Sequence, residues 1–180
     1  MILVTGPPAT GKSTLAAALV RRVTGALIDQ DVATGALVDV IGSLIDVHDL
    51  DDLRLAALTR TARYETIVRL AEDNLRCGVA VVLVAPFTRE RRDLGSWHDL
   101  ERRLDTAGGV PTLVWLQLEP PEILARMRAR AALRDVDKLR DEVSLLARLD
   151  LDPPAGPHLR LDAAAPVGDL VDLVLAHLRV

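Results

Sequence analysis

The stretch that most constrains this chain is GPPATGKS at residues 6–13, which directly follows the apolar run ILVT at 2–5. It fits the pattern G-x-x-x-x-G-K-[ST], whose glycines let the backbone turn around a phosphate group. Successive backbone N–H groups then point into the loop, and the helix predicted at 13–23 adds its positive N-terminal end. The motif and its position therefore indicate a nucleoside triphosphate site.

Each part of this loop has an expected role. Lys12 is expected to reach the β- and γ-phosphates of the nucleotide, and the Ser13 hydroxyl to bind Mg²⁺. The donor is expected to be ATP or GTP. The loop at 161–166 lies near the expected base site, but its residues do not distinguish between the two nucleotides. The predicted nucleotide-binding residues of the loop are Pro8, Ala9, Thr10, Gly11, Lys12, Ser13 and Thr14.

Composition narrows the class of protein. The 180 residues are enough for one domain with a sizeable core. A net charge of −4 and 2% aromatic residues argue against nucleic acid as a partner. No apolar run approaches the roughly 18 residues that span a membrane, so we expect a soluble cytoplasmic protein, either a monomer or a homodimer. The single cysteine, Cys77, is expected to be a small buried apolar residue.

Strand-like and helix-like segments alternate along the chain, which predicts an α/β fold with a parallel sheet. Continuous apolar runs, as buried parallel strands require, support the central strands. The predicted strands are 2–5, 26–29, 79–86, 112–118 and 158–162. The predicted helices are 13–23, 35–47, 50–76, 122–135, 137–149 and 166–179.

Two carboxylates follow the second strand in the segment LIDQD. Asp29 and Asp31 are expected at the same sheet edge as the phosphate loop, because the carboxyl ends of parallel strands share one edge. We interpret Asp31 as the base that accepts the proton of an attacking hydroxyl and as a substrate ligand. We interpret Asp29 as the residue on the metal side. The alternative is that they only cap the following helix.

The segment APFTRERR at 85–92 follows the third strand at the same edge. Arg89, with Arg91 and Arg92 near it, is expected to clamp the substrate or the transferring phosphate. At least one of the three is expected to be only part of a solvated helix face. Phe87 is interpreted either as an apolar wall for the substrate or as a core residue.

A cationic helix follows the fourth strand and predicts a mobile lid at about 122–140. Arg126, Arg130 and Arg134 are spaced by four residues and therefore share one helix face. Arg130 is the predicted catalytic arginine, Arg126 is placed near the base or phosphates, and Arg134 near the substrate. The alternative is an exposed helix paired with acidic neighbours, namely Glu119, Glu122 and Asp135.

Several classes of nucleotide-binding protein do not fit the chain. The base-reading motif N-K-x-D of Ras-like GTPases is absent, since the only asparagine is Asn74. The third strand ends without the aspartate that typically binds magnesium in ATPases, and no L-S-G-G-Q transporter signature occurs. The chain is also small for a motor ATPase. These exclusions favour a small kinase.

Together the segments GPPATGKSTLA, LIDQD and APFTRERRD and the arginine-rich helix resemble the small P-loop kinases of metabolites and antibiotics, such as chloramphenicol phosphotransferase and adenylylsulfate kinase. The resemblance implies a nucleoside-monophosphate-kinase-like sheet of five parallel strands in the order 2-3-1-4-5. It also implies transfer of the γ-phosphate of ATP or GTP, with Mg²⁺, to a hydroxyl of a small-molecule acceptor.

Departures from these families leave the acceptor open. Val32 and Ala33 replace the Asn and Arg that usually follow the aspartates of adenylylsulfate kinases. The helices at 35–76, expected to line the acceptor pocket, favour a moderately apolar antibiotic or a nucleoside- or sugar-containing natural product. The alternatives are a housekeeping metabolite kinase, a nucleotide-dependent ATPase or switch, and a polynucleotide 5′-kinase, the last disfavoured by the acidic net charge.

Overall fold

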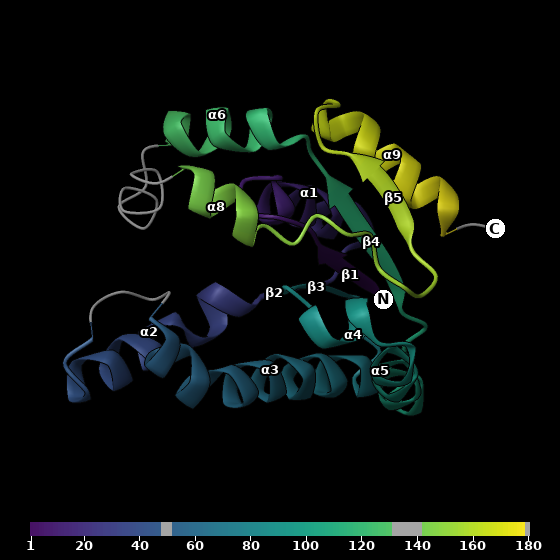
Figure 1. The fold of residues 1–180 in the computed structure, drawn as a ribbon. Helices are drawn as coiled ribbons and strands as arrows, with labels where there is room; N and C mark the ends of the chain where they lie inside the picture. Colours follow the sequence, from purple (N-terminus) through teal and green to yellow (C-terminus); the bar gives the residue numbers. More distant parts are fainter. Residues whose placement is uncertain (48–51, 131–141, 179–180) are drawn as a thin grey trace.

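The computed structural model describes residues 1–47, 52–130 and 142–178, which form a central sheet with helices on both faces (Figure 1). The strands are β1 (Ile2–Thr5), β2 (Ala26–Asp29), β3 (Val81–Val84), β4 (Thr112–Gln117) and β5 (Leu159–Asp162). The longer helices are α1 (Lys12–Val23), α2 (Gln30–Leu44), α3 (Leu53–Arg76), α5 (Leu94–Thr106), α6 (Pro120–Arg130) and α9 (Val167–His177). The shorter helices are α4 (Thr88–Arg92) and α8 (Glu142–Arg148).

All five strands are parallel and lie in the order β2-β3-β1-β4-β5, which confirms the expected topology. The register pairs Val4 of β1 with Val84 of β3 and with Val114 of β4. The carboxyl ends of β1, β2 and β3 therefore come together at one edge. The segments after these strands carry the phosphate loop, the aspartate pair and the arginine-rich helix α4.

Alternate residues along each strand supply two separate cores. Ile2 and Val4 of β1 face α1, α6 and α9, whereas Leu3 faces α3 and α5. The inner strands β1 and β3 are buried along their whole length, as expected for parallel strands covered on both faces. The structure thus has three layers, which give the sheet edge a rigid base.

Three local features differ from the sequence-based expectation. Helix α2 begins at Gln30, not at 35, because the Asp29 carboxylate caps its first turn. Helices α4 and α5 were not predicted, although Trp97, Leu100 and Leu104 of α5 are buried at helical spacing. Cys77 is exposed at the end of α3, so the expectation that it is buried was wrong.

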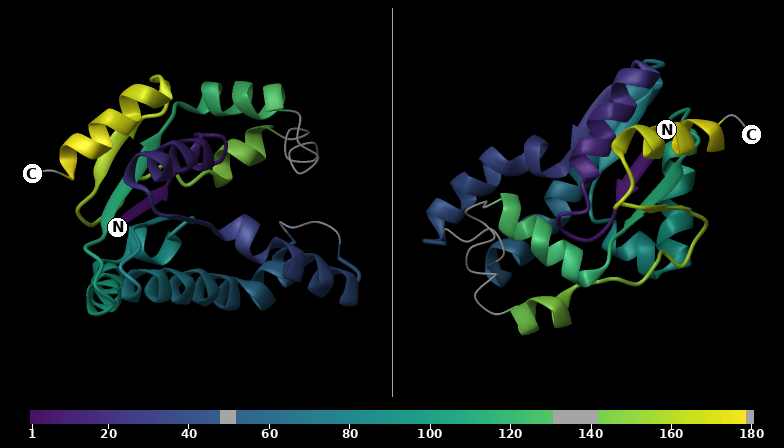
Figure 2. Two further views of the ribbon diagram at one scale, coloured as in Figure 1. Left: turned by 180° about the vertical axis from the view of Figure 1, so that it is seen from behind. Right: turned by 90° about the horizontal axis from the view of Figure 1, so that it is seen from above.

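The predicted lid is only partly described. Helix α6 and helix α8 flank residues 131–141, which lie outside the described residues, and an Arg128–Glu142 ion pair joins the two helices. Figures 1 and 2 show α6 and α8 extending from the sheet in the same direction as α2 and the N-terminal half of α3. In the described part of the chain, no helix is long and apolar enough to cross a membrane.

Candidate active site

The loop between β1 and α1 has the backbone shape that a phosphate site requires. Gly6 lies against β4 so closely that a Cβ there would come within 2.5 Å of the Leu116 carbonyl oxygen. Gly11 has a φ of 84°, in the left-handed region that glycine favours. The Thr10 side chain is buried and its hydroxyl donates to the Pro7 carbonyl at 2.9 Å. The loop is therefore held in shape from inside.

Lys12 lies across this loop. Its Nζ donates to the carbonyl oxygens of Gly6 and Pro7 at 3.0 and 2.7 Å. Carbonyl oxygens are neutral acceptors, so phosphate oxygens, which are charged, form stronger bonds with the same ammonium group. The lysine is thus positioned within the loop where a bound triphosphate would replace the carbonyl contacts.

The residues expected to hold Mg²⁺ lie in direct contact. The Ser13 hydroxyl donates to Asp29 Oδ2 at 2.7 Å. Magnesium prefers oxygen ligands and takes only one or two from the protein, with the rest from water and phosphates. This pair fits that requirement. Among the described residues, no group of three or more His, Cys, Asp or Glu side chains could hold a metal ion without such outside ligands.

The two aspartates have different surroundings. The Asp29 carboxylate has two partners. Its Oδ1 accepts a hydrogen bond from the Asp31 backbone N–H at 3.0 Å, and its Oδ2 accepts one from the Ser13 hydroxyl. Asp31 accepts a hydrogen bond from Arg63 Nη2 at 2.6 Å. Arg63 also donates from Nε to the Thr34 hydroxyl at 2.9 Å. Capping and a chemical role are therefore compatible for Asp29, and Asp31 is oriented by a residue of α3.

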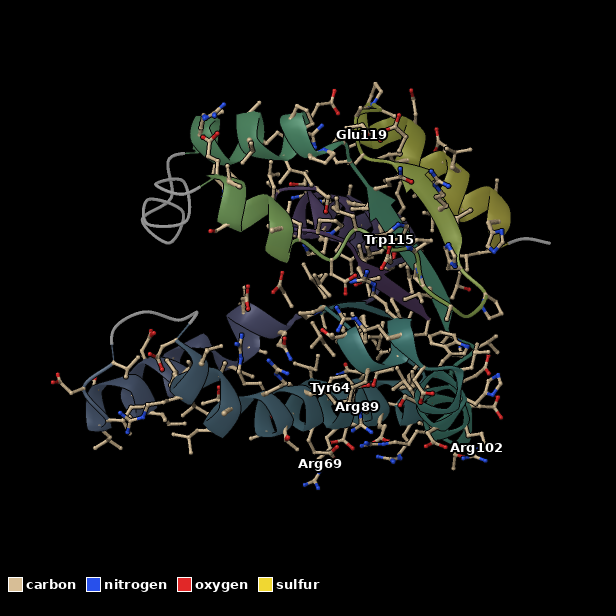
Figure 3. The ribbon with its side chains drawn as sticks, viewed as in Figure 1. Tyr64, Arg69, Arg89, Arg102, Trp115 and Glu119 are labelled. Atoms are coloured by element: carbon tan, nitrogen blue, oxygen red, sulfur yellow. The ribbon has the colours of Figure 1, made fainter. Side chains whose placement is uncertain are left out.

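Helix α4 separates the arginines of the third segment. Residues two apart on a helix lie about 200° apart around its axis, so Arg89 and Arg91 face opposite sides. Figure 3 shows Arg89 beside Tyr64 on α3, on the other side of α4 from Trp115. Arg91 faces the sheet, with its guanidinium carbon 4.0 Å from the centre of the Trp115 ring. Phe87 is only 1% exposed and packs edge-on against Tyr64.

The segment after α8 is fastened to α4. Arg91 donates from Nη2 to the Asp152 carbonyl oxygen at 2.7 Å, and the Ala155 backbone N–H donates to the Arg91 carbonyl oxygen at 2.8 Å. Asp150 forms ion pairs with both Arg91 and Arg92. Burial lowers the pKa of Arg91, and the Asp150 carboxylate opposes this change. The segment that follows α8 is therefore anchored beside the sheet edge.

The arginines of α6 have separate positions. Arg126 donates from Nη2 to the Ala163 carbonyl oxygen at 2.8 Å, which joins α6 to the loop after β5. The loop after β5 is the one expected near the nucleobase, so the structure brings Arg126 into contact with that loop. Arg130 ends the described part of α6 and faces the cavity defined below. The predicted substrate residue Arg134 lies outside the described residues.

These segments enclose one cavity of about 740 Å³. Most of the predicted site residues line it, namely Pro8, Ala9, Gly11, Lys12, Ser13, Thr14, Asp29, Asp31 and Arg130. Its described lining does not include Thr10, Phe87, Arg89 or Arg126. It does include Arg91 and Arg92, which were expected near Arg89, and side chains with no predicted role, namely Val38, Arg63, Thr88, Leu149 and Asp150.

The sequence matches the family AAA_33, described as an AAA domain, over residues 1–151. The chain belongs to this family. Comparison of this AAA-domain protein with curated proteins yields no match.

Solved structures of small kinases share the fold. A provisionally assigned kinase from Chloroflexus aurantiacus is 22% identical, with a TM-score of 0.70 over 99% of this chain and 94% of that chain. A gluconokinase from Sinorhizobium meliloti is 19% identical, with a TM-score of 0.60 over 97% and 89%. An APS kinase from Mycobacterium tuberculosis, in complex with AMPPNP and APS, is 18% identical, with a TM-score of 0.62 over 99% and 96%. These likenesses confirm that the AAA-domain chain has the small P-loop kinase fold.

Proposed function

We propose that this protein is a phosphotransferase that moves the γ-phosphate of ATP or GTP to a hydroxyl group of a small molecule. The observation that carries the proposal is that Asp31 and the phosphate loop line the same cavity. A nucleotide switch needs the loop but no base for an acceptor hydroxyl, so a carboxylate in the same cavity favours transfer. The shared fold of small kinases supports the same reading.

The residues divide the work of the transfer. The acceptor hydroxyl oxygen forms a bond to the γ-phosphorus, and the bond from that phosphorus to the β–γ bridging oxygen breaks. The hydroxyl proton passes to Asp31, and the nucleoside diphosphate leaves with the electron pair of the broken bond. Lys12 and Arg130, which both line the cavity, stabilise the negative charge on the transferring group.

Magnesium is the ion that Ser13 and Asp29 would hold beside the donor. When bound, it neutralises charge on the β- and γ-phosphates. Arg63 holds the Asp31 carboxylate toward the cavity from α3. These residues hold and orient the reacting groups.

The proposed transfer does not by itself define the class of acceptor. An antibiotic inactivated by O-phosphorylation and a housekeeping metabolite both present a suitable hydroxyl. We favour the metabolite, because the described lining of the cavity includes four charged side chains besides the predicted site residues, namely Arg63, Arg91, Arg92 and Asp150. The moderately apolar acceptor expected from the composition of 35–76 is therefore not the one that we propose.

Replacing the proposed base tests the function. Asp31→Asn keeps the shape of the side chain but cannot accept the hydroxyl proton, so we expect the transfer rate to fall by about 10²- to 10⁴-fold. Binding of the nucleotide, measured by calorimetry with AMPPNP, should stay within about twofold of wild type. Asp39→Asn, on an exposed position of the same helix, is the matched control. Unchanged transfer in Asp31→Asn would exclude Asp31 as the base.

A further inference from the structure

Two adjacent arginines of α4 share one carboxylate. Arg91 Nη2 lies 3.3 Å from Asp150 Oδ1, and Arg92 Nη2 lies 2.8 Å from Asp150 Oδ2. In the part of the chain that the structure describes, no other acidic side chain forms an ion pair with either guanidinium group. The cluster of Arg91, Arg92 and Asp150 therefore carries a positive charge that its own carboxylate does not balance.

Burial makes this excess charge costly. Arg91 is only 6% exposed, and its buried Nε makes no hydrogen bond to any described residue. The Trp115 ring and the Asp152 carbonyl oxygen stabilise the cation without a full charge, and the Asp152 carboxylate favours it only through space, without an ion pair to either arginine. A buried charge is stable when an opposite charge and full hydrogen bonding accompany it. An anion placed beside this pair would thus stabilise it further.

Arg92 is the member of the cluster that such an anion can reach. Its side chain is 65% exposed, and both it and Arg91 line the cavity. Its Nε donates to Asp150 Oδ2 at 3.1 Å, and its Nη2 lies 2.8 Å from the same oxygen in an ion pair. Among the described residues none accepts a hydrogen bond from Arg92 Nη1. The planar guanidinium group thus keeps one donor edge for a ligand, in the geometry that suits a carboxylate.

The strand order indicates whether the anion at Arg92 belongs to the acceptor or to the nucleotide donor. Strand β3, which leads into α4, lies between β2 and β1. The arginines therefore lie between the Asp31 segment and the phosphate loop, on the side of β1 that the acceptor occupies in the proposed function. The donor has its own cations in Lys12 and Arg130, and its base side lies toward Arg126 and β5.

We infer that the acceptor carries a small anionic group, a carboxylate in the simplest case, which binds Arg92 while a hydroxyl of the same molecule lies at Asp31. This inference rests on the proposed function and narrows it to hydroxy acids. Neutral alcohols and neutral natural products lack the group that balances the cluster, so they are poor acceptors.

Matched pairs of acid and neutral compounds test this assignment. The probes are glycerate with glycerol, gluconate with sorbitol, and shikimate with its methyl ester. Binding of each is measured by calorimetry with AMPPNP and Mg²⁺ bound. We expect at least one acid to bind at least about tenfold more tightly than its neutral partner, the lower end of what hydrogen bonds to charged groups contribute. Arg92→Gln should remove this preference, and Arg102→Gln, an equal charge change on exposed α5, should retain it.

Several outcomes would overturn the inference. These are equal binding of acid and neutral partners, no binding of any acid, an acid preference that survives in Arg92→Gln, or an equal loss in Arg89→Gln. Weaker AMPPNP binding in Arg92→Gln would assign Arg92 to the donor and would also overturn it. Phosphoryl transfer to the neutral members at the rate of the acids would reject the anionic acceptor but leave the kinase function standing. A protein that does not bind AMPPNP would instead reject the proposed function itself.

Discussion

At the scale of single residues, an arginine from another helix holds the proposed base, since Arg63 Nη2 of α3 donates to the Asp31 carboxylate at 2.6 Å. Asp29 and Asp31 follow a short strand, so their place at the sheet edge could be predicted from local pattern. Arg63 lies 32 residues after Asp31, and its contact with Asp31 exists only because α3 packs beside α2. No local signal distinguishes it from the other arginines of α3, so only the folded chain reveals it.

Arg63 leads to a prediction at this scale. Arg63→Lys keeps the charge but cannot bond Asp31 and Thr34 together, because only the guanidinium group has donors at both ends. We expect the specificity constant kcat/KM for the acceptor to fall by about tenfold, a loss of about 1.4 kcal/mol. Arg60→Lys, on an exposed position one turn earlier, is the matched control. Equal rates in the two variants would show that Arg63 does not orient Asp31.

At the scale of elements, a helix can be predicted from the sequence when it carries a stripe of apolar residues at helical spacing. Helix α5 has a stripe of buried residues at Trp97, Leu100 and Leu104 that the sequence shows as plainly as any other. Helix α4 has only five residues and no stripe, so its orientation comes from packing. This is why Arg89 was favoured over Arg92: without the orientation of α4, three neighbouring arginines are equivalent.

The contact between α3 and α5 gives a prediction on stability. Arg103 of α5 bonds Glu65 and Glu72 of α3, and hydrogen bonds from Arg103 and then Arg69 lower the pKa of Glu65 to about 2. A carboxylate with a depressed pKa adds stability above its unfolded pKa of about 4.5, and this stability is lost as the pH falls toward 2. Glu65 is partly exposed, so solvent screening reduces the effect at pH 7 to about 1 kcal/mol.

The free energy of unfolding in urea, measured for wild type and Glu65→Gln between pH 7 and pH 3, checks this value. The variant should be less stable at pH 7 by about 1 kcal/mol, and the difference should shrink below pH 4.5. Glu119→Gln, at an exposed residue with no ion pair among the described residues, should show little difference at any pH (Figure 3). A deficit in Glu65→Gln that is the same at pH 7 and pH 3 would reject the ion-pair explanation.

At the scale of the whole molecule, the parallel sheet explains why distant segments form one site. Each strand ends at the same edge, so residues from 6 to 150 line a single cavity although they are far apart in the sequence. Alternating strands and helices predict this arrangement, and the loop motif marks the edge that matters. The proposed acceptor could not be predicted in this way, since Arg63 of α3 and Arg92 of α4 reach the cavity only through the packing of their helices.

The central claim is that the cavity transfers phosphate to an acceptor and does not merely hydrolyse the nucleotide. The most direct measurement is the fate of a radiolabelled γ-phosphate from ATP, with Mg²⁺, in the presence and absence of hydroxy acids. The account predicts that label appears in an organic phosphate monoester, only when an acceptor is present, and that Lys12→Ala abolishes it. Release of inorganic phosphate at the same rate with and without every acceptor, or full transfer by Lys12→Ala, would contradict the account.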